Sequence, residues 1–152
     1  MTKEEVKKII RDVPDFPQKG ILFKDLTTAF ANPECMEWIA NEMLQLYQGK
    51  GITKVLGIES RGFVLAPILA GNIHAGFIPV RKKGKLPADT IEVSYAKEYG
   101  VDTIEIHRDA LTPEDIVVIH DDLLATGGTM AAANKSVSQQ RFLRHIHNER
   151  AT

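Results

Sequence analysis

The sequence predicts an α/β fold: a mainly parallel, twisted sheet flanked by helices, with a flexible hairpin or flap and a short N-terminal segment. Short apolar runs of strand length, over residues 54–59, 76–82 and 116–120, alternate with stretches of helical character. This alternation is typical of parallel strands that are covered by helices on both faces. The chain has 152 residues and no internal repeat or obvious linker, so we expect a single domain over residues 1–152.

Composition and charge exclude several classes of function. Apolar residues make up 43% of the chain and charged residues 26%, and the formal net charge is −1. We therefore expect no nucleic-acid partner, and any anion site must be local. The apolar run over residues 62–71 is too short to cross a bilayer, and the charges in residues 1–10 argue against a signal peptide. Cys35 is the one cysteine, which leaves no disulfide and no metal cluster. These features favour a cytoplasmic protein without a membrane partner.

The first elements are predicted from helical spacing and from proline. Residues 4–13 carry four apolar side chains at helical spacing, ending with Val13, which predicts a short amphipathic helix. Pro14 and Pro17 then predict the end of that helix and an irregular segment over residues 14–27.

A second helix is predicted from its capping residues. Asn32 and Pro33 are typical of an N-cap and a first helical position, and Gly49 marks the approximate end of the helix. The remaining pattern predicts, in chain order, a strand over 54–59, a helix over 62–73, a strand over 76–82, a period-two hairpin over 90–108 that turns at Gly100, a buried strand over 116–120 and a helix from about Gly127.

Two acids and a glycine-rich turn follow the last predicted strand, at the sheet edge where α/β proteins bind ligands. Ionised carboxylates only accept hydrogen bonds, which suits a vicinal diol such as the 2′,3′ hydroxyls of ribose. The closely spaced N–H groups of the turn, at the start of a helix, suit a phosphate monoester. An ordinary strand–turn–helix junction would explain the glycines but not the paired acids. The predicted sugar-phosphate site consists of Asp121, Asp122, Ala125, Thr126, Gly127, Gly128 and Thr129.

Residues 116–130, IVVIHDDLLATGGTM, closely resemble the motif with which type I phosphoribosyltransferases bind phosphoribosyl diphosphate (PRPP), in the form found in the adenine-specific members. Four further segments match that family in order and spacing: VPDFPQKGILFKDLTT at 13–28, GIESRGF at 57–63, RKKGKLP at 81–87 and SYAKEYG at 94–100. The resemblance runs from about residue 10 to Ala133. It implies a homodimeric purine-salvage enzyme that converts adenine and PRPP to AMP and diphosphate, with Mg²⁺ bound mainly through PRPP oxygens.

The resemblance also implies roles for the other segments. Glu98 is implied as the catalytic general acid or base that handles the proton of adenine, with Tyr99 helping to close the flap. Residues 1–32 are implied to form an N-terminal base-binding segment, in which Phe23 stacks on the adenine ring and Leu22 and Lys24 frame it. The residues implied to bind diphosphate are Ser60, Arg61, Gly62, Arg81, Lys82 and Lys85.

Three departures from the family pattern are visible. His120 stands where the family has an apolar residue, so it could perturb the carboxylates beside it, and Lys24 replaces an arginine. After Ala133 the sequence is polar and basic without a strand-like run, so residues 134–152 are predicted to form an atypical or truncated tail. A strand missing there would lower stability or alter association.

Two alternatives remain open from the sequence. The phosphate motif is common to phosphoribosyltransferases, so another base, such as guanine, hypoxanthine or orotate, could be the substrate; the segment around Phe23 discriminates. A non-catalytic protein that binds PRPP or a nucleotide is the other alternative, because of the altered tail. Arg61 and Glu98 argue against it, since a binding module would not need them.

Overall fold

The computed structural model of the chain describes residues 1–97, 100–122, 127–139 and 146–147. The chain divides into two compact units, Met1–Leu46 and Tyr47–Thr152, and each is described by itself. The single domain predicted over residues 1–152, with an N-terminal base-binding segment over 1–32, stays a prediction.

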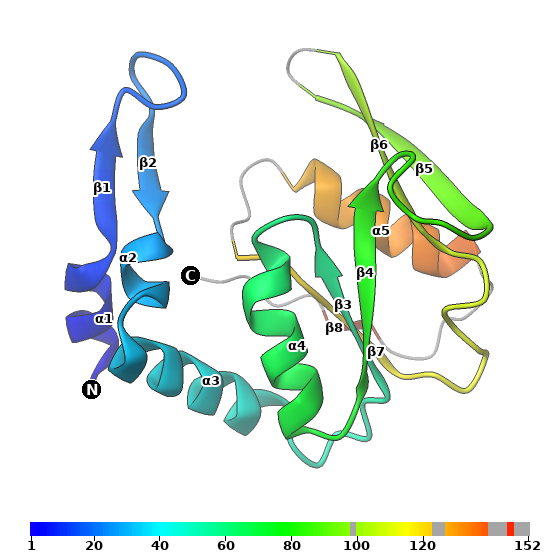
Figure 1. Cartoon of the computed structure of the whole chain (residues 1–152), viewed down its shortest axis with the longest axis horizontal. Coiled ribbons are helices and arrows are strands. Elements are labelled where there is room, and N and C mark those ends of the chain that lie inside the picture. The colour runs from blue at the N-terminus through cyan, green and yellow to red at the C-terminus, as the bar shows by residue number, and fades with distance from the viewer. Residues whose placement is uncertain (98–99, 123–126, 140–145, 148–152) are drawn as a thin grey trace. The chain divides into compact units, whose positions relative to one another are not determined.

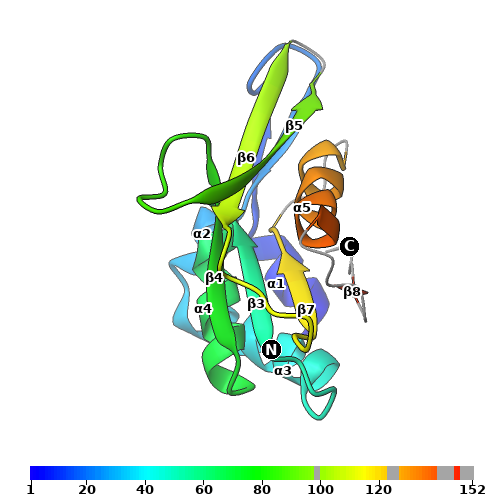
Figure 2. The same cartoon turned by 90° about the vertical axis from the view of Figure 1, so that its right-hand side faces the viewer.

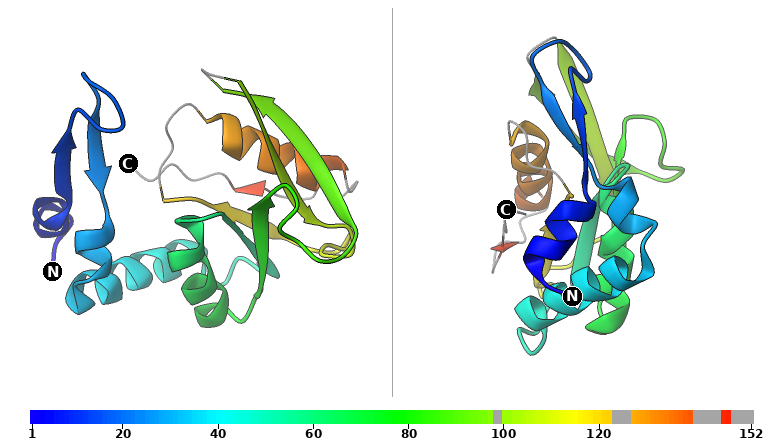
Figure 3. Two further views of the ribbon diagram at one scale, coloured as in Figure 1. Left: turned by 45° about the horizontal axis from the view of Figure 1, so that its top comes forward. Right: turned by 90° about the vertical axis from the view of Figure 1, so that its left-hand side faces the viewer.

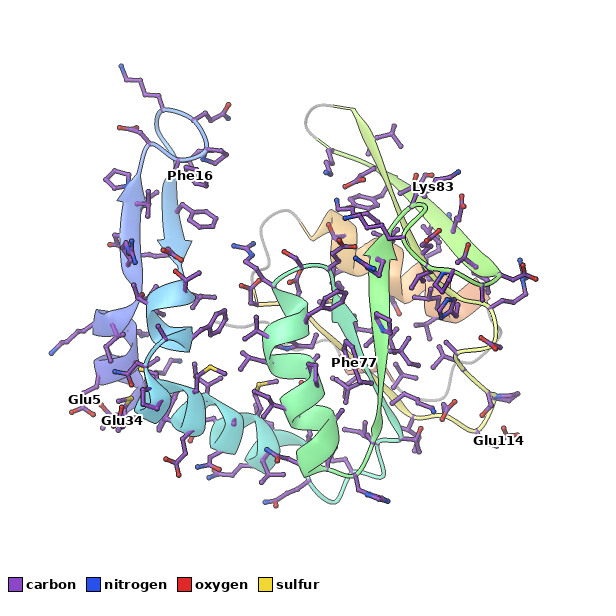
Figure 4. The ribbon with its side chains drawn as sticks, viewed as in Figure 1. Glu5, Phe16, Glu34, Phe77, Lys83 and Glu114 are labelled. Carbon is purple, nitrogen blue, oxygen red and sulfur yellow. The ribbon has the colours of Figure 1, made fainter. Side chains whose placement is uncertain are left out.

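The first unit combines helices with a two-stranded antiparallel hairpin. Its first helix is held by a capping box, in which Thr2 N–H donates to Glu5 Oε2 at 2.7 Å and Glu5 N–H donates to Thr2 Oγ1 at 3.3 Å. Glu5 is labelled in Figure 4, and the two strands lie side by side in Figures 1 and 3. The elements are α1 (Lys3–Ile9), β1 (Arg11–Pro14), β2 (Leu22–Asp25), α2 (Thr27–Phe30) and α3 (Pro33–Tyr47), whose last residue belongs to the second unit.

The prediction for residues 4–27 is wrong in one respect, because part of this segment forms a hairpin. The backbone at Ile10 is extended, so α1 ends at Ile9, and Val13 lies in β1 opposite Phe23. Pro14 is the last residue of β1 and lies opposite Leu22. Proline has no N–H to donate, and it is tolerated at this position at the end of a two-stranded hairpin. Helical spacing could not reveal this, because the partner strand lies about ten residues further on.

The predicted start of α3 is confirmed. The Oδ1 atom of Asn32 accepts the N–H of Cys35 at 2.9 Å, and Pro33 is the first helical residue. The buried side chains of Val6, Ala29 and Cys35 form the small core of this unit. The helix ends at Tyr47, and Gly49 adopts a φ of +73° just beyond it.

The second unit is built on a mixed sheet with the strand order β5-β6-β4-β3-β7-β8. Neighbouring strands from β4 through β3 and β7 to β8 run parallel, whereas β6 runs antiparallel to both β4 and β5. The mainly parallel sheet and the hairpin are therefore confirmed. The strands are β3 (Lys54–Ile58), β4 (Gly76–Lys82), β5 (Thr90–Ala96), β6 (Val101–His107), β7 (Val117–His120) and β8 (Ile146–His147).

Helices cover both faces of this sheet. Figure 2 shows α4 (Gly62–Asn72) and α5 (Gly128–Gln139) on opposite sides of the strands. The apolar residues of α4 that are buried include Leu65 and Leu69. The core on the other face joins residues of the sheet to α5: Leu56, Ile58, Val80, Ile104, Ile106, Val117, Ile119, Ala132, Ala133 and Val137.

Two glycines allow the start of α4 to lie close against the sheet. A Cβ on Gly57 would lie 2.8 Å from Phe77 Cε2 and 2.9 Å from the Gly62 carbonyl oxygen. Phe77, labelled in Figure 4, lies between β4 and α4. A Cβ on Gly62 would lie 2.9 Å from the carbonyl oxygen of His120. The turn before α4 is therefore held beside the carboxyl end of β7.

The expectation for the tail is wrong in part. Helix α5 continues to Gln139 and buries Ser136 and Val137, so an amphipathic helix extends past Ala133. A short strand follows, in which Ile146 pairs with Val117 in parallel. Among the described residues no helix has the length and apolar character needed to span a membrane.

Candidate functional site

A cavity of about 230 Å³ opens at the carboxyl ends of the parallel strands of the second unit, where α/β sheets bind ligands. Its wall is built from the ends of β3 and β4, from the segments after β3 and β7, from the hairpin and from the start of α5. The residues predicted from the sequence that line it are Arg61, Arg81, Lys82, Asp121, Gly127, Gly128 and Thr129. The cavity thus brings together side chains that lie far apart in the sequence.

The two acids after β7 have different surroundings. Asp121 lines the cavity and accepts the N–H of Asp122 at 2.9 Å. Asp122 has a side chain only 1% exposed and pairs with Arg61, whose Nε lies 3.3 Å from Asp122 Oδ1. Burial raises the pKa of Asp121, and the neighbouring Asp122 carboxylate adds to that rise. Asp121 therefore faces the cavity, while Asp122 holds an arginine of the same wall.

His120 does not add positive charge beside these acids. Burial lowers its pKa to about 4, so the ring is neutral at pH 7. Any perturbation of the neighbouring carboxylates by His120 therefore comes from a neutral ring at pH 7.

The glycine-rich turn after the acids ends in a helix, as expected. Gly127 has a φ of +82°, which favours glycine, and its carbonyl oxygen accepts the N–H of Ala131 at 2.9 Å. Gly128 and Thr129 form the start of α5, the end of a helix toward which its backbone N–H groups point. This arrangement suits an anion. Ala125 and Thr126 lie outside the described residues.

The turn before α4 places only one of its three predicted residues on the cavity. Arg61 lines the wall. Ser60 is exposed, and its carbonyl oxygen accepts the N–H of Phe63 at 3.1 Å, whereas Gly62 is buried as the first residue of α4. Ser60 and Gly62 thus shape the turn from which Arg61 reaches the cavity.

The basic residues at the end of β4 and just beyond it have an acidic partner that the sequence analysis missed. Glu59 lines the cavity and accepts the backbone N–H of Lys82 at 2.9 Å, and its carboxylate lies 2.8 Å from Lys85 Nζ and 3.3 Å from Arg81 Nε. Burial alone would raise the pKa of Glu59, but the contacts with Lys85, Lys82 and Arg81 outweigh it and lower the pKa to about 2. An acid directly after a buried strand, in the motif GIESRGF, was the available signal.

A second acid, Asp102 on β6, was also missed. It forms ion pairs with Lys82 and with Lys97, whose Nζ lies 2.5 Å from Asp102 Oδ2. Tyr95 donates a hydrogen bond from its hydroxyl to Asp102 at 3.3 Å and accepts one from Thr129 Oγ1 at 2.9 Å. The contacts with Lys82 and Lys97 hold the pKa of Asp102 well below its usual range. These contacts link the hairpin to the start of α5.

The predicted base-binding residues belong to the first unit. Leu22, Phe23 and Lys24 lie on β2, where Leu22 is exposed and the Phe23 ring packs edge-on against Phe16 with centroids 5.2 Å apart. Lys24 pairs with Asp12 at 2.5 Å. The predicted catalytic residues Glu98 and Tyr99 lie outside the described residues.

Metal-ligating side chains do not gather in the described ranges. Within residues 1–97, 100–122, 127–139 and 146–147, no group of three or more His, Cys, Asp or Glu side chains could hold a metal ion.

Comparison with known proteins is consistent with this geometry. Residues 28–141 match the model of the phosphoribosyl transferase domain. The chain is 60% identical over 139 residues to an adenine phosphoribosyltransferase of Bacteroides thetaiotaomicron. The matched residues cover 91% of this chain and 79% of that protein. A crystal structure of the enzyme of that name from Rhodothermus marinus is 52% identical with a TM-score of 0.84, covering 90% of this chain and 78% of the other. The corresponding structure from Thermoanaerobacter pseudethanolicus is 42% identical with a TM-score of 0.90, covering 95% and 85%.

Proposed function

Because the chain belongs to the phosphoribosyl transferase family, we propose that it transfers a phosphoribosyl group from PRPP to adenine, giving AMP and diphosphate. The observation that carries the proposal is the shared cavity, in which Asp121 and the start of α5 lie on one wall with Arg61, Arg81 and Lys82. Acceptors for a sugar diol and donors for anions thus meet in one place.

The ribose phosphate of PRPP binds at the segment after β7. The N–H groups of Gly127, Gly128 and Thr129, together with Ala125 and Thr126 of the same motif, receive the 5-phosphate. Asp121, which lines the cavity, accepts hydrogen bonds from the ribose hydroxyls, while Asp122, predicted for the same role, is buried and holds Arg61 beside the site. The positive φ of Gly127 and the helix that starts after it support this assignment.

The diphosphate binds at the basic wall of the cavity. Arg61, Arg81, Lys82 and Lys85 neutralise the negative charge that develops as the bond to the ribose breaks. Ser60 and Gly62 shape the turn that carries Arg61. The ion pairs of Glu59 with Arg81 and Lys85 support the assignment, because one carboxylate that lines the cavity holds both cations beside it before substrate binds.

Adenine binds through the first unit, by analogy with the family. Phe23 stacks on the ring, and Leu22 and Lys24 frame it. Glu98 exchanges the proton of adenine as general acid or base, and Tyr99 helps to exclude water from the reacting sugar. The adenine phosphoribosyltransferases at 60% and 52% identity support adenine as the base.

The residues at the cavity fit Mg²⁺ held mainly by PRPP. Asp121 offers a carboxylate at the cavity wall, and Mg²⁺ commonly binds through substrate phosphates, waters and one or two carboxylates. When bound, the ion neutralises diphosphate charge. A homodimer and a cytoplasmic location are further parts of this proposal.

An assay of AMP formation tests the function. The full chain is incubated with PRPP, Mg²⁺ and either adenine, hypoxanthine, guanine or orotate, and nucleotide formation is followed spectrophotometrically. Adenine is expected to be the substrate used most efficiently. Turnover only with another base would refute adenine as the substrate. Tight PRPP binding without any turnover would favour the alternative of a non-catalytic protein that binds PRPP. Sedimentation analysis of the same sample tests the homodimer.

A further inference from the structure

Asp102 occupies a position where an apolar residue would be expected. On β6 the side chains of Ile104 and Ile106 face the core and are fully buried. Strand alternation places Asp102 on the same face, and Tyr95 lies directly opposite it on β5. A carboxylate at the edge of an apolar core costs free energy unless it is paired and hydrogen-bonded. The partners of Asp102 therefore indicate why the residue is there.

Those partners include two lysines that reach Asp102 from different segments. Lys82 comes from the end of β4, and Lys97 directly follows β5. Both lysines line the cavity, and their side chains are 40% and 47% exposed. An ammonium group has three donors, so each lysine can contact Asp102 and still donate toward the cavity. Two ammonium charges on one carboxylate also leave this part of the wall positive.

The remaining contacts of Asp102 fix its orientation. Thr103 N–H donates to Asp102 Oδ1 at 3.0 Å, and the Tyr95 hydroxyl donates to Oδ2 at 3.3 Å. The same hydroxyl accepts a hydrogen bond from Thr129 at the start of α5. Asp102 is thus held by its own strand and, through Tyr95, by the proposed phosphate-binding turn.

We propose that Asp102 is a positioning residue of the diphosphate site, which holds Lys82 and Lys97 on the cavity wall, and that Lys97 is a further diphosphate-binding cation. This inference rests on the proposed function. Lysine side chains lose much conformational entropy when they are ordered. An acid that orders them before PRPP arrives removes that cost from binding. Asp102 itself touches no substrate in this arrangement and acts through the two lysines.

Steady-state kinetics of Asp102→Asn test the proposal. The substitution keeps the shape of the side chain and one of its two acceptor oxygens, but it removes the charge that orders the lysines. We expect KM for PRPP and the inhibition constant of diphosphate to rise about tenfold, as for loss of a charge-assisted contact, while KM for adenine changes less than about twofold. Lys97→Gln is expected to raise KM for PRPP in the same direction.

Glu92→Gln is the matched control. Glu92 lies on the same hairpin and pairs with Lys83 at 2.9 Å, but both side chains are solvent-exposed and neither lines the cavity. Lys83 is labelled in Figure 4. This variant removes one acidic partner from a neighbouring lysine, and its KM for PRPP is expected to match that of the unaltered chain.

A combined variant separates positioning from general stability. In a chain that carries Lys82→Gln and Lys97→Gln, the added Asp102→Asn change is expected to raise KM for PRPP by less than about twofold, because the groups through which Asp102 acts are gone. A full additive effect there overturns the proposal. Tighter diphosphate binding by Asp102→Asn also overturns it, since Asp102 would then compete with substrate. If the unaltered chain forms no AMP, the proposed function fails instead.

Discussion

Substitution of Gly57 by alanine tests whether close packing of α4 on β3 positions the site. Gly57 lies inside β3, in the middle of the sheet. The new Cβ would lie 2.8 Å from Phe77 Cε2, 2.9 Å from Ala66 Cβ and 2.9 Å from the Gly62 carbonyl oxygen. Real Cβ contacts essentially never fall below 3.0 Å, so the ring, the helix or the strand must shift.

The expected loss of stability follows from two opposing effects. Overpacking of a filled core costs about 1–3 kcal/mol, and three contacts below 3.0 Å place Gly57→Ala at the upper end, about 3 kcal/mol. Replacing glycine also lowers the conformational entropy of the unfolded chain, which stabilises the fold by about 0.4–1 kcal/mol. The net loss is about 2 kcal/mol, which for a chain of this size lowers the unfolding temperature by about 4–8 °C.

Thermal unfolding followed by circular dichroism measures this change, with Gly71→Ala as the control. Gly71 lies in the same helix, α4, and a Cβ there would meet no atom within 4 Å, so alanine is expected to stabilise by about 0.5–1 kcal/mol. A lower unfolding temperature for Gly57→Ala together with a higher one for Gly71→Ala supports the proposed close packing of α4 on β3. An unfolding temperature of Gly57→Ala equal to or above that of the unaltered chain would refute it.

Three further predictions concern charge and capping. Asp121→Asn is expected to lower turnover but to stabilise the fold at pH 7 by on the order of 1 kcal/mol. Because burial raises the pKa of Asp121, the wild-type acid contributes stability at low pH that is lost as the pH rises, so the advantage of asparagine in thermal melts should vanish toward pH 4. Glu59→Gln is expected to destabilise by about 2 kcal/mol at pH 7. Since the pKa of Glu59 is lowered to about 2, its contribution is present above its ordinary value of 4.5 and lost toward pH 2; a constant difference across urea titrations at these pH values would contradict the ion-pair assignment. Asn32→Ala removes the cap on Cys35 N–H and should cost about 1 kcal/mol in urea unfolding, whereas no change would mean that the cap is not formed in solution.

Local patterns predicted the second unit well and the first unit less well. The predicted strand over 76–82 coincides with β4, and the period-two pattern located the hairpin of β5 and β6. In both cases one face is buried, so the apolar period is visible in the sequence. Val13 has the spacing of a helical residue, but it pairs with Phe23 in a strand. Such pairing between separate segments overrides local preference and cannot be read from either segment alone.

The sequence predicted several cations of the cavity and the acid Asp121, but not how the charged residues pair. Arg61 and Asp121 line the wall, as their positions after strands indicated, and so does Lys82, as the family resemblance implied. Glu59 and Asp102 were missed because the lysines and the arginine that they pair with come from other segments of the chain, and ion pairs between distant segments leave no local pattern. For Asp102, the spacing of two residues from Ile104 was a usable signal, since it places an acid on a buried face.

The pairing of β3 with β7 has a consequence for folding while the chain is still being synthesised. Thr53 N–H, just before β3, donates to Ile116 O at 2.9 Å, and these residues are 63 positions apart. A ribosome adds ~5–20 residues per second, so β7 emerges on the order of several seconds after β3. For that interval a strongly apolar strand has an open edge, which is a template for aggregation. Yield in the cell therefore depends on whether that edge is shielded while translation proceeds.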